Sequence, residues 1–175
     1  MDKKILVAYA TKYGATAEIA EKIGEVLRQA GLATDVIPAD RVRDLTTYRA
    51  VILGSAVYMF RWRKEAVHFL NKHERALAER PVWLFSSGPL SAGDPVEQLE
   101  GWRVPKAQQA IVDRIQPRQI VVFHGALDMQ KLNPIEKWMM SKFDSPVGDF
   151  RDWDAITTWA FSIADALKAA SEETI

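Results

Sequence analysis

The strongest constraint on the fold is a set of short, continuous apolar runs that alternate with segments of helical periodicity. Five strands are expected, at residues 5–9, 34–37, 50–54, 82–85 and 119–123. Four main helices are expected, at residues 15–30, 64–77, 107–115 and from Asp152 onward. Most of the strands lack the polar alternation of a half-exposed strand, which is typical of strands buried on both faces of a parallel sheet. The alternation therefore predicts right-handed crossovers and helices on both faces.

This pattern fits an α/β chain of three layers around a five-stranded parallel sheet in the order 2-1-3-4-5. In that topology ligands bind beyond the carboxyl ends of the strands, where the strand order reverses between the first and the third. The loops after Tyr9, Leu53 and Phe85 are therefore the places to search for a site. With 175 residues, no linker-like segment and no internal repeat, the chain is expected to form a single domain over residues 1–175.

Composition excludes several classes of chemistry. The chain has no cysteine, which excludes disulfides, thiol catalysis and Cys-ligated metal or iron–sulfur clusters. Lys plus Arg and Asp plus Glu both number 23, so no global charge points to nucleic acid. The apolar run near the start is too short for a signal peptide or a membrane span, and a cytoplasmic location is expected. Basic residues gather at 61–80 and acidic ones at 144–175, for which solvated helix faces are a simpler interpretation than a docking surface.

The loop after the first strand has the pattern Thr11-x-x-Gly14-x-Thr16. The glycine lets the backbone curl around an oxyanion, which the N–H groups and the dipole of the following helix attract. The pattern alone is weak, because the same residues also suit a plain turn and helix cap. Its place after a buried strand favours a phosphate site. The chain lacks both the Gly-Lys-Ser/Thr of a P-loop and a Gly-x-Gly-x-x-Gly motif.

The loops after the third and fourth strands suit a flat heterocyclic ring. In the first of them small residues are followed by aromatic ones, of which Tyr58 lies closest to the strand end and is the preferred ring contact. For Phe60 and Trp62, packing under the next helix is an equally good interpretation. The Gly- and Pro-rich stretch at 86–95 is either a plain surface bend or a source of amides and hydroxyls for the polar edge of the ring. Its place beyond a strand favours the second reading.

In order and spacing these loops resemble the three FMN loops of the flavodoxin family, over nearly the whole chain. Within that family the chain looks closest to the flavodoxin-like subgroup that includes menaquinone-dependent protoporphyrinogen IX dehydrogenase. The matching features are the 11–16 loop, the aromatic stretch after Gly54, the turn at 125–127 and the final helix entered through Asp152-Trp153. The resemblance implies a flavodoxin-like sandwich with FMN as cofactor. The cofactor-binding residues it implies are Thr11, Lys12, Tyr13, Gly14, Ala15, Thr16, Ser55, Ala56, Val57, Tyr58, Met59, Ser87, Gly88, Pro89 and Leu90.

The resemblance also implies a function, with one alternative. The expected function is an FMN-binding redox protein that transfers electrons between a reductase or partner protein and an acceptor. The alternative is an oxidoreductase similar to the menaquinone-dependent dehydrogenase, acting on a hydrophobic substrate with a quinone as acceptor, so the sequence leaves open whether the chain is an enzyme. Tyr13 stands where typical flavodoxin carriers have a third Thr, and the neutral chain lacks their acidic surface, which disfavours a low-potential shuttle. A receiver domain needs a carboxylate at the end of the first strand, where this chain has Tyr9-Ala10-Thr11.

The roles of two long segments, 88–106 and 125–151, cannot be assigned from the spacing of their apolar residues. In the second, Ile135, Trp138, Met139 and Phe143 form an amphipathic stripe beside several lysines. Core packing is the simpler interpretation of this stripe. The alternatives are a cover over a hydrophobic substrate, a docking site for a partner or a peripheral membrane contact through residues 131–143.

No catalytic residue and no metal ligand is assigned. His68 and His73 are expected on the surface, and His124 is expected far from the ring. Flavin chemistry needs no catalytic histidine, because the cofactor carries the electrons and the protein orients and tunes it.

Overall fold

The computed structural model describes residues 3–142 and 146–172. A parallel sheet lies at its centre, with the strand order β2-β1-β3-β5-β6. The strands are β1 (Lys4–Ala10), β2 (Thr34–Pro38), β3 (Tyr48–Tyr58), β5 (Val82–Ser87) and β6 (Gln119–Phe123). The additional β4 (Arg61–Trp62) is a two-residue strand that pairs antiparallel with the end of β3. The predicted order 2-1-3-4-5 is therefore confirmed for the five parallel strands.

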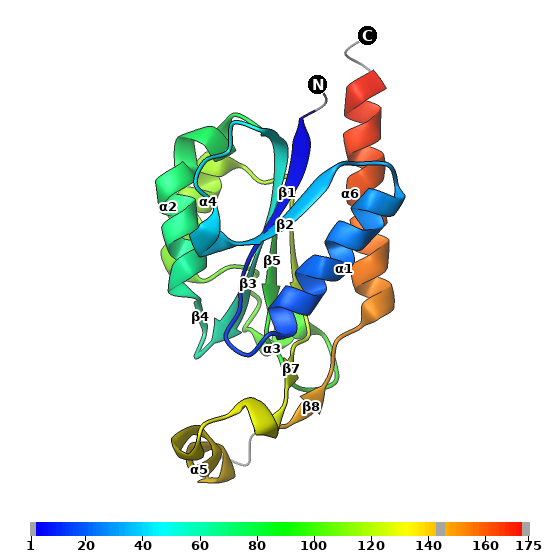
Figure 1. The fold of residues 1–175 in the computed structure, drawn as a ribbon. Helices are drawn as coiled ribbons and strands as arrows, with labels where there is room; N and C mark the ends of the chain where they lie inside the picture. The colour runs from blue at the N-terminus through cyan, green and yellow to red at the C-terminus, as the bar shows by residue number, and fades with distance from the viewer. Residues whose placement is uncertain (1–2, 143–145, 173–175) are drawn as a thin grey trace.

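Helices cover both faces of the sheet (Figure 1). One face carries α1 (Ala15–Gln29) and α6 (Trp153–Glu172), and the other carries α2 (Lys64–Ala78) and α4 (Gln109–Ile115). Successive residues of β1 point to opposite faces, so Ile5 and Val7 pack with α1 and α6, whereas Leu6 packs on the α2 side. Because the central strands are buried on both faces, their sequences are continuous apolar runs.

The segment after β6 leaves the sheet beyond the carboxyl ends of the strands (Figure 1). It contains β7 (Ala126–Leu127), the 3-10 turn η3 (Met129–Lys131), α5 (Pro134–Lys142) and β8 (Gly148–Asp149). Strands β7 and β8 pair antiparallel and form the base of this excursion. Helix α5 begins with a reciprocal cap, in which Glu136 N donates to Asn133 Oδ1 at 2.8 Å and Asn133 N donates to Glu136 Oε2 at 3.1 Å.

The remaining short elements lie in the connections. They are η1 (Ala39–Arg41), α3 (Pro95–Gln98) and η2 (Lys106–Gln108). None of the helices within residues 3–142 and 146–172 combines the length and apolar character that a bilayer crossing requires.

The stripe on α5 does not pack into the core, so that interpretation is wrong. Ile135 is 71% exposed, Trp138 58% and Met139 42%. The fourth member of the stripe, Phe143, lies outside the described residues. Helix α5 lies beyond the end of the sheet rather than against a face, and Ile135, Trp138 and Met139 remain exposed.

Two other side chains differ from expectation. His73 is buried rather than exposed, with its ring centroid 4.8 Å from that of Phe69, and this burial lowers its pKa. His68 is exposed, as expected. The apolar residues of the final helix, from Trp153 to Leu167, have helical spacing and predict one buried stripe. Trp153 is nevertheless 37% exposed, because it lies in the first turn and packs under the guanidinium of Arg151. Helical periodicity alone does not show where along its length a helix meets the core.

Candidate functional site

A cavity of about 390 Å³ lies beyond the carboxyl ends of β1, β3 and β5. Its volume is within the usual range of small-molecule sites. Many of the residues predicted to bind the cofactor line it, namely Thr11, Lys12, Tyr13, Ala15, Thr16, Ala56, Val57, Tyr58, Ser87, Gly88 and Leu90. Three loops that are distant in sequence therefore meet at one place, because parallel strands end at the same edge of the sheet.

The other four predicted residues lie outside the cavity lining. Gly14 forms the turn behind the loop, and Pro89 presents its carbonyl oxygen to Gly125 N at 3.0 Å. Ser55 is fully buried, where its hydroxyl accepts a hydrogen bond from Arg63 N at 2.9 Å. Met59 is 75% exposed and has a left-handed backbone, so its side chain projects into solvent.

The excursion after β6 supplies a further wall of the cavity. The lining residues from this region are Gly125, Ala126, Leu127, Leu132, Glu136, Met139, Met140 and Pro146. From the sequence, the 125–127 turn was noted as a feature of the resemblance, and Met139 as part of a stripe for which a cover over a hydrophobic substrate was one alternative. The Asn133-x-x-Glu136 pattern marks a helix start, but a cap gives no information on where the helix lies. A Cβ on Gly125 would lie 3.2 Å from Gly88 Cα, so glycine lets these two loops cross closely.

The first loop is built to receive an anion. Gly14 occupies the N-cap of α1 with φ 97°, a left-handed backbone that favours glycine, and Thr11 Oγ1 accepts a hydrogen bond from its N–H at 2.9 Å. Within the described residues no side chain caps α1. The positive end of a long helix is therefore left without an internal partner, in a loop that also contains the buried hydroxyl of Thr16.

A charged cluster joins this loop to α5. Tyr13 Oη donates to Glu136 Oε1 at 2.7 Å, and Lys12 Nζ lies 3.0 Å from the same oxygen. Lys12 Nζ also lies 3.7 Å from the centroid of the Tyr58 ring. The bonds from Tyr13, Asn133 and Lys12 lower the pKa of Glu136 to about 2. Glu136 thus holds α5 against the 11–16 loop, and Lys12 joins that loop to Tyr58.

The pKa of Glu136 tests this cluster. A carbon-13 NMR titration of the Glu136 carboxyl is expected to give a pKa of about 2, and Tyr13→Phe is expected to raise it towards the ordinary value of 4.5. Because the folded-state pKa is depressed, the contact contributes stability above about pH 4.5 and loses it as the pH falls towards 2. An ordinary pKa in the unsubstituted protein would show that α5 is not tied down in solution.

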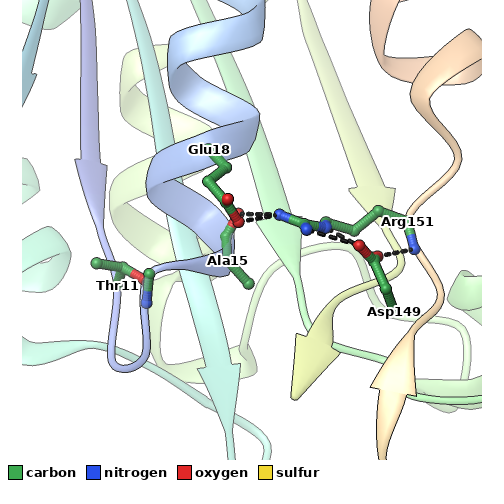
Figure 2. A network of polar contacts seen from close by, with 6 residues as sticks. Thr11, Ala15, Glu18, Asp149 and Arg151 are labelled. Carbon is green, nitrogen blue, oxygen red and sulfur yellow. Dashed lines mark hydrogen bonds and ion pairs between the residues drawn. The ribbon is translucent and has the colours of Figure 1, made fainter. Parts of the chain in front are cut away.

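Arg151 fastens the end of the excursion to the start of α1 (Figure 2). Its side chain is 8% exposed, and its Nη1 donates to Glu18 Oε2 at 2.6 Å and to the Ala15 carbonyl at 3.2 Å. Its Nε and Nη2 donate to the carboxylate of Asp149 at 2.9 and 2.7 Å. A planar guanidinium satisfies both carboxylates at once. The residue therefore fixes β8 relative to the first turn of α1.

Arg151→Met is expected to lower the free energy of unfolding by about 1–3 kcal/mol, because charge-assisted bonds are lost from a buried side chain. Urea unfolding measures this loss. Arg75→Met is the matched control, since Arg75 is 95% exposed and its ion pair with Glu79 is expected to contribute less than about 1 kcal/mol. Equal effects of the two substitutions would contradict the role given to Arg151.

Comparison with known proteins agrees with this geometry. The Flavodoxin domain family matches residues 6–154. Protoporphyrinogen IX dehydrogenase (quinone) of Escherichia coli strain K12 is 22% identical over 172 residues, which cover 92% of this chain and 94% of that protein. A flavodoxin from the domain Archaea aligns with a TM-score of 0.62 and 15% identity, over 94% of this chain and 99% of that one. Rubredoxin oxygen:oxidoreductase of Desulfovibrio gigas aligns with a TM-score of 0.64 and 16% identity, over 95% of this chain and 36% of that one.

Proposed function

Since the chain belongs to the Flavodoxin domain family, we propose that it binds FMN in the cavity beyond β1, β3 and β5 and transfers electrons between a reductase or partner protein and an acceptor. FMN is the cofactor of this family. When bound, it accepts and donates the electrons, and the chain holds and orients it. The observation that carries the proposal is an uncapped helix end beside a largely apolar cavity at the topological switch point.

The residues present fit both ends of FMN. The phosphate would lie at the start of α1, where Thr11, Thr16 and the N–H groups of the first turn are available. Lys131 adds a positive charge there, because its Nζ lies 3.6 Å from where a Cβ on Gly14 would stand. The ring would lie between Tyr58 and the 87–90 loop. The cavity thus combines an anion site with a flat apolar slot, as a phosphorylated heterocycle requires.

The absorption spectrum of the purified protein tests this proposal. Flavin bands near about 375 and about 450 nm, with one FMN per chain, are expected, since that chromophore belongs to the cofactor. If the protein is purified without colour, titration with FMN is expected to restore both bands. A chain that stays colourless and takes up no FMN would contradict the proposal.

A second candidate is an oxidoreductase that acts on a hydrophobic substrate, with a quinone as acceptor. The favouring observation is the wall that α5 adds to the cavity, where Met139, Met140 and Leu132 extend it beyond the FMN loops. The E. coli relative carries the name of such a dehydrogenase, in the subgroup that the sequence predicted. Turnover of protoporphyrinogen with menaquinone is the test. A yellow protein that carries out no such turnover would favour electron transfer between proteins.

The exposed stripe of α5 bears on a further part of this proposal, contact with a membrane surface. Within the predicted segment 131–143, Ile135 and Trp138 are exposed on the same helix as Lys137 and Lys142, which supports peripheral contact with a membrane surface. Flotation with vesicles measures this contact. The cytoplasmic location and the single domain over residues 1–175 stay predictions.

A further inference from the structure

A second groove lies on the α2 side of the molecule, next to the proposed ring site. Its volume is about 940 Å³, and its lining includes Phe60 and Trp102 with the cations Arg61, Lys64 and Lys106. Tyr58 lines the FMN cavity, and Phe60, two residues further on, lines this groove. The two sites therefore share one loop.

The groove has a fixed base. The indole N–H of Trp62 donates to Ser86 Oγ at 2.8 Å, and Ser86 Oγ donates to the Arg103 carbonyl at 2.7 Å. Trp62 is buried, so β4 and the 100–106 loop are held together by a hydrogen-bonded chain under the surface. The backbone of β4 and of the 100–106 loop is thus held in place by the core beneath this groove.

The rim of the groove presents an apolar tip. Phe60 is 56% exposed, and its ring lies 6.4 Å from that of Trp102 in an edge-to-face arrangement. Met59 and Phe60 both have positive φ, at 48° and 59°, although neither is glycine. Such backbone strain at an exposed aromatic residue is typical of functional loops. The turn holds two large apolar side chains in water beside the proposed flavin.

The charges around this tip are unpaired. Within the described residues, no ion pair or hydrogen bond engages the side chain of Arg61, Lys64 or Lys106. Glu100 is the acidic residue of the lining, so positive charge is in excess. Helix α2 also begins at the groove, and within the described residues no side chain caps it, which adds the positive end of its dipole. An apolar centre with a charged rim is the usual anatomy of a protein interface.

We propose that this groove and the Met59–Phe60 tip form the docking surface for an acidic redox partner protein. The proposal rests on the proposed function, because it names the partner of the same flavin site. Charge complementarity selects the partner, since an acidic surface would neutralise Arg61, Lys64 and Lys106 and cover the exposed ring of Phe60. The simpler interpretation of the basic residues at 61–80 is that they are solvated helix faces. That interpretation does not explain the groove next to the proposed flavin site or the strained backbone at Met59 and Phe60. A surface of this kind steers partners electrostatically and suits brief encounters.

Binding to two haem proteins of opposite charge tests the docking surface. The probes are the acidic haem domain of cytochrome b5 and the basic cytochrome c, titrated into the FMN-loaded protein and followed by calorimetry and by the NMR signals of Trp102. Cytochrome b5 is expected to bind at 0.01 M salt, where the Debye length is about 30 Å, and to lose at least about tenfold in affinity at 0.15 M, where it is about 8 Å. Cytochrome c is expected to bind more weakly at both salt concentrations.

The double substitution Lys64→Glu and Lys106→Glu is expected to weaken cytochrome b5 binding by about tenfold or more at low salt. Lys168→Glu on α6 makes one such charge reversal, half of the charge change of the double substitution, on the opposite face of the sheet, and is expected to stay within about twofold. Phe60→Ser removes the apolar tip and is expected to weaken binding without increasing its salt dependence.

The docking surface would be overturned if cytochrome b5 does not bind at low salt, if cytochrome c binds equally well, or if the double substitution has no effect on binding. It would also be overturned if the double substitution weakens only self-association of the chain or only its binding to phosphatidylglycerol vesicles. FMN content is measured on the same samples. A flavin-loaded protein that fails to bind contradicts the docking surface alone, whereas a protein that takes up no FMN contradicts the proposed function.

Discussion

Gly14→Val is expected to weaken FMN binding by at least about tenfold. Gly14 has φ 97°, and an L side chain in this region costs about 1–2 kcal/mol, more for a β-branched one. The loop escapes the strain by rotating the peptide that precedes α1. That rotation moves the N–H groups and the Thr11 hydroxyl that would hold the phosphate. Titration of the apo protein with FMN, followed by fluorescence quenching, measures the change.

Gly31→Val is the matched control. Gly31 also has a left-handed backbone, with φ 85°, and nothing lies within 4 Å of where its Cβ would stand. It follows the C-terminal end of α1, so the same helix receives a similar strain at its opposite end. Gly31→Val is expected to lower the free energy of unfolding by about 1–2 kcal/mol and to leave FMN affinity unchanged. If both substitutions weaken FMN equally, strain in α1 rather than the phosphate loop controls binding. Thr16→Ala is a milder test of the same loop and is expected to weaken FMN to a lesser extent.

Gly54→Ala is expected to give the largest loss of stability for the smallest change in the chain. Gly54 lies in β3 opposite Phe85 of β5, and a Cβ there would lie 1.9 Å from the tip of the Phe85 ring. The ring is fully buried against Phe123 and Trp159, so it has little room to move away. Overpacking of this kind costs about 1–3 kcal/mol, and more where the neighbours are rigid. Urea unfolding measures the loss.

A double-mutant cycle identifies the cause. Phe85→Leu alone leaves a partial cavity and is expected to destabilise the protein, but combined with Gly54→Ala it removes the clash. The double variant is therefore expected to be more stable than the sum of the two single effects predicts, by about 1 kcal/mol or more. Additive effects would show that the glycine is required for another reason.

The position of the site follows from sequence to a large extent. The runs in β1, β3 and β5 predicted a parallel sheet, and parallel topology brings the loops at residues 11–16, 55–58 and 87–90 to one edge. Glycine at position 14 indicated a tight turn of the backbone, and the structure gives this residue a left-handed backbone with φ 97°. These features are local, since apolar periodicity reports which faces of a segment are buried.

The position of the excursion after β6 could not be predicted from apolar periodicity. The stripe of Ile135, Trp138 and Met139 has the spacing of a buried helix face, yet α5 lies beyond the sheet and leaves it exposed. An amphipathic pattern records only that one face is apolar. Whether that face meets a core, a ligand or a partner depends on where the ends of the segment are anchored, and here β7, β8 and Arg151 anchor them outside the layers.

The alternation of apolar runs and helices, together with the loop around Gly14, determined the order of the sheet and the edge at which the site lies. These depend on burial of neighbouring residues and on the backbone freedom of single positions, both of which a sequence records directly. The tertiary structure decided that Tyr13 and Lys12 hold Glu136, that α5 walls the cavity and that Phe60 and Trp102 meet at a basic groove. Each of these is a contact between distant segments, and its energy exists only once the sheet has brought the segments together.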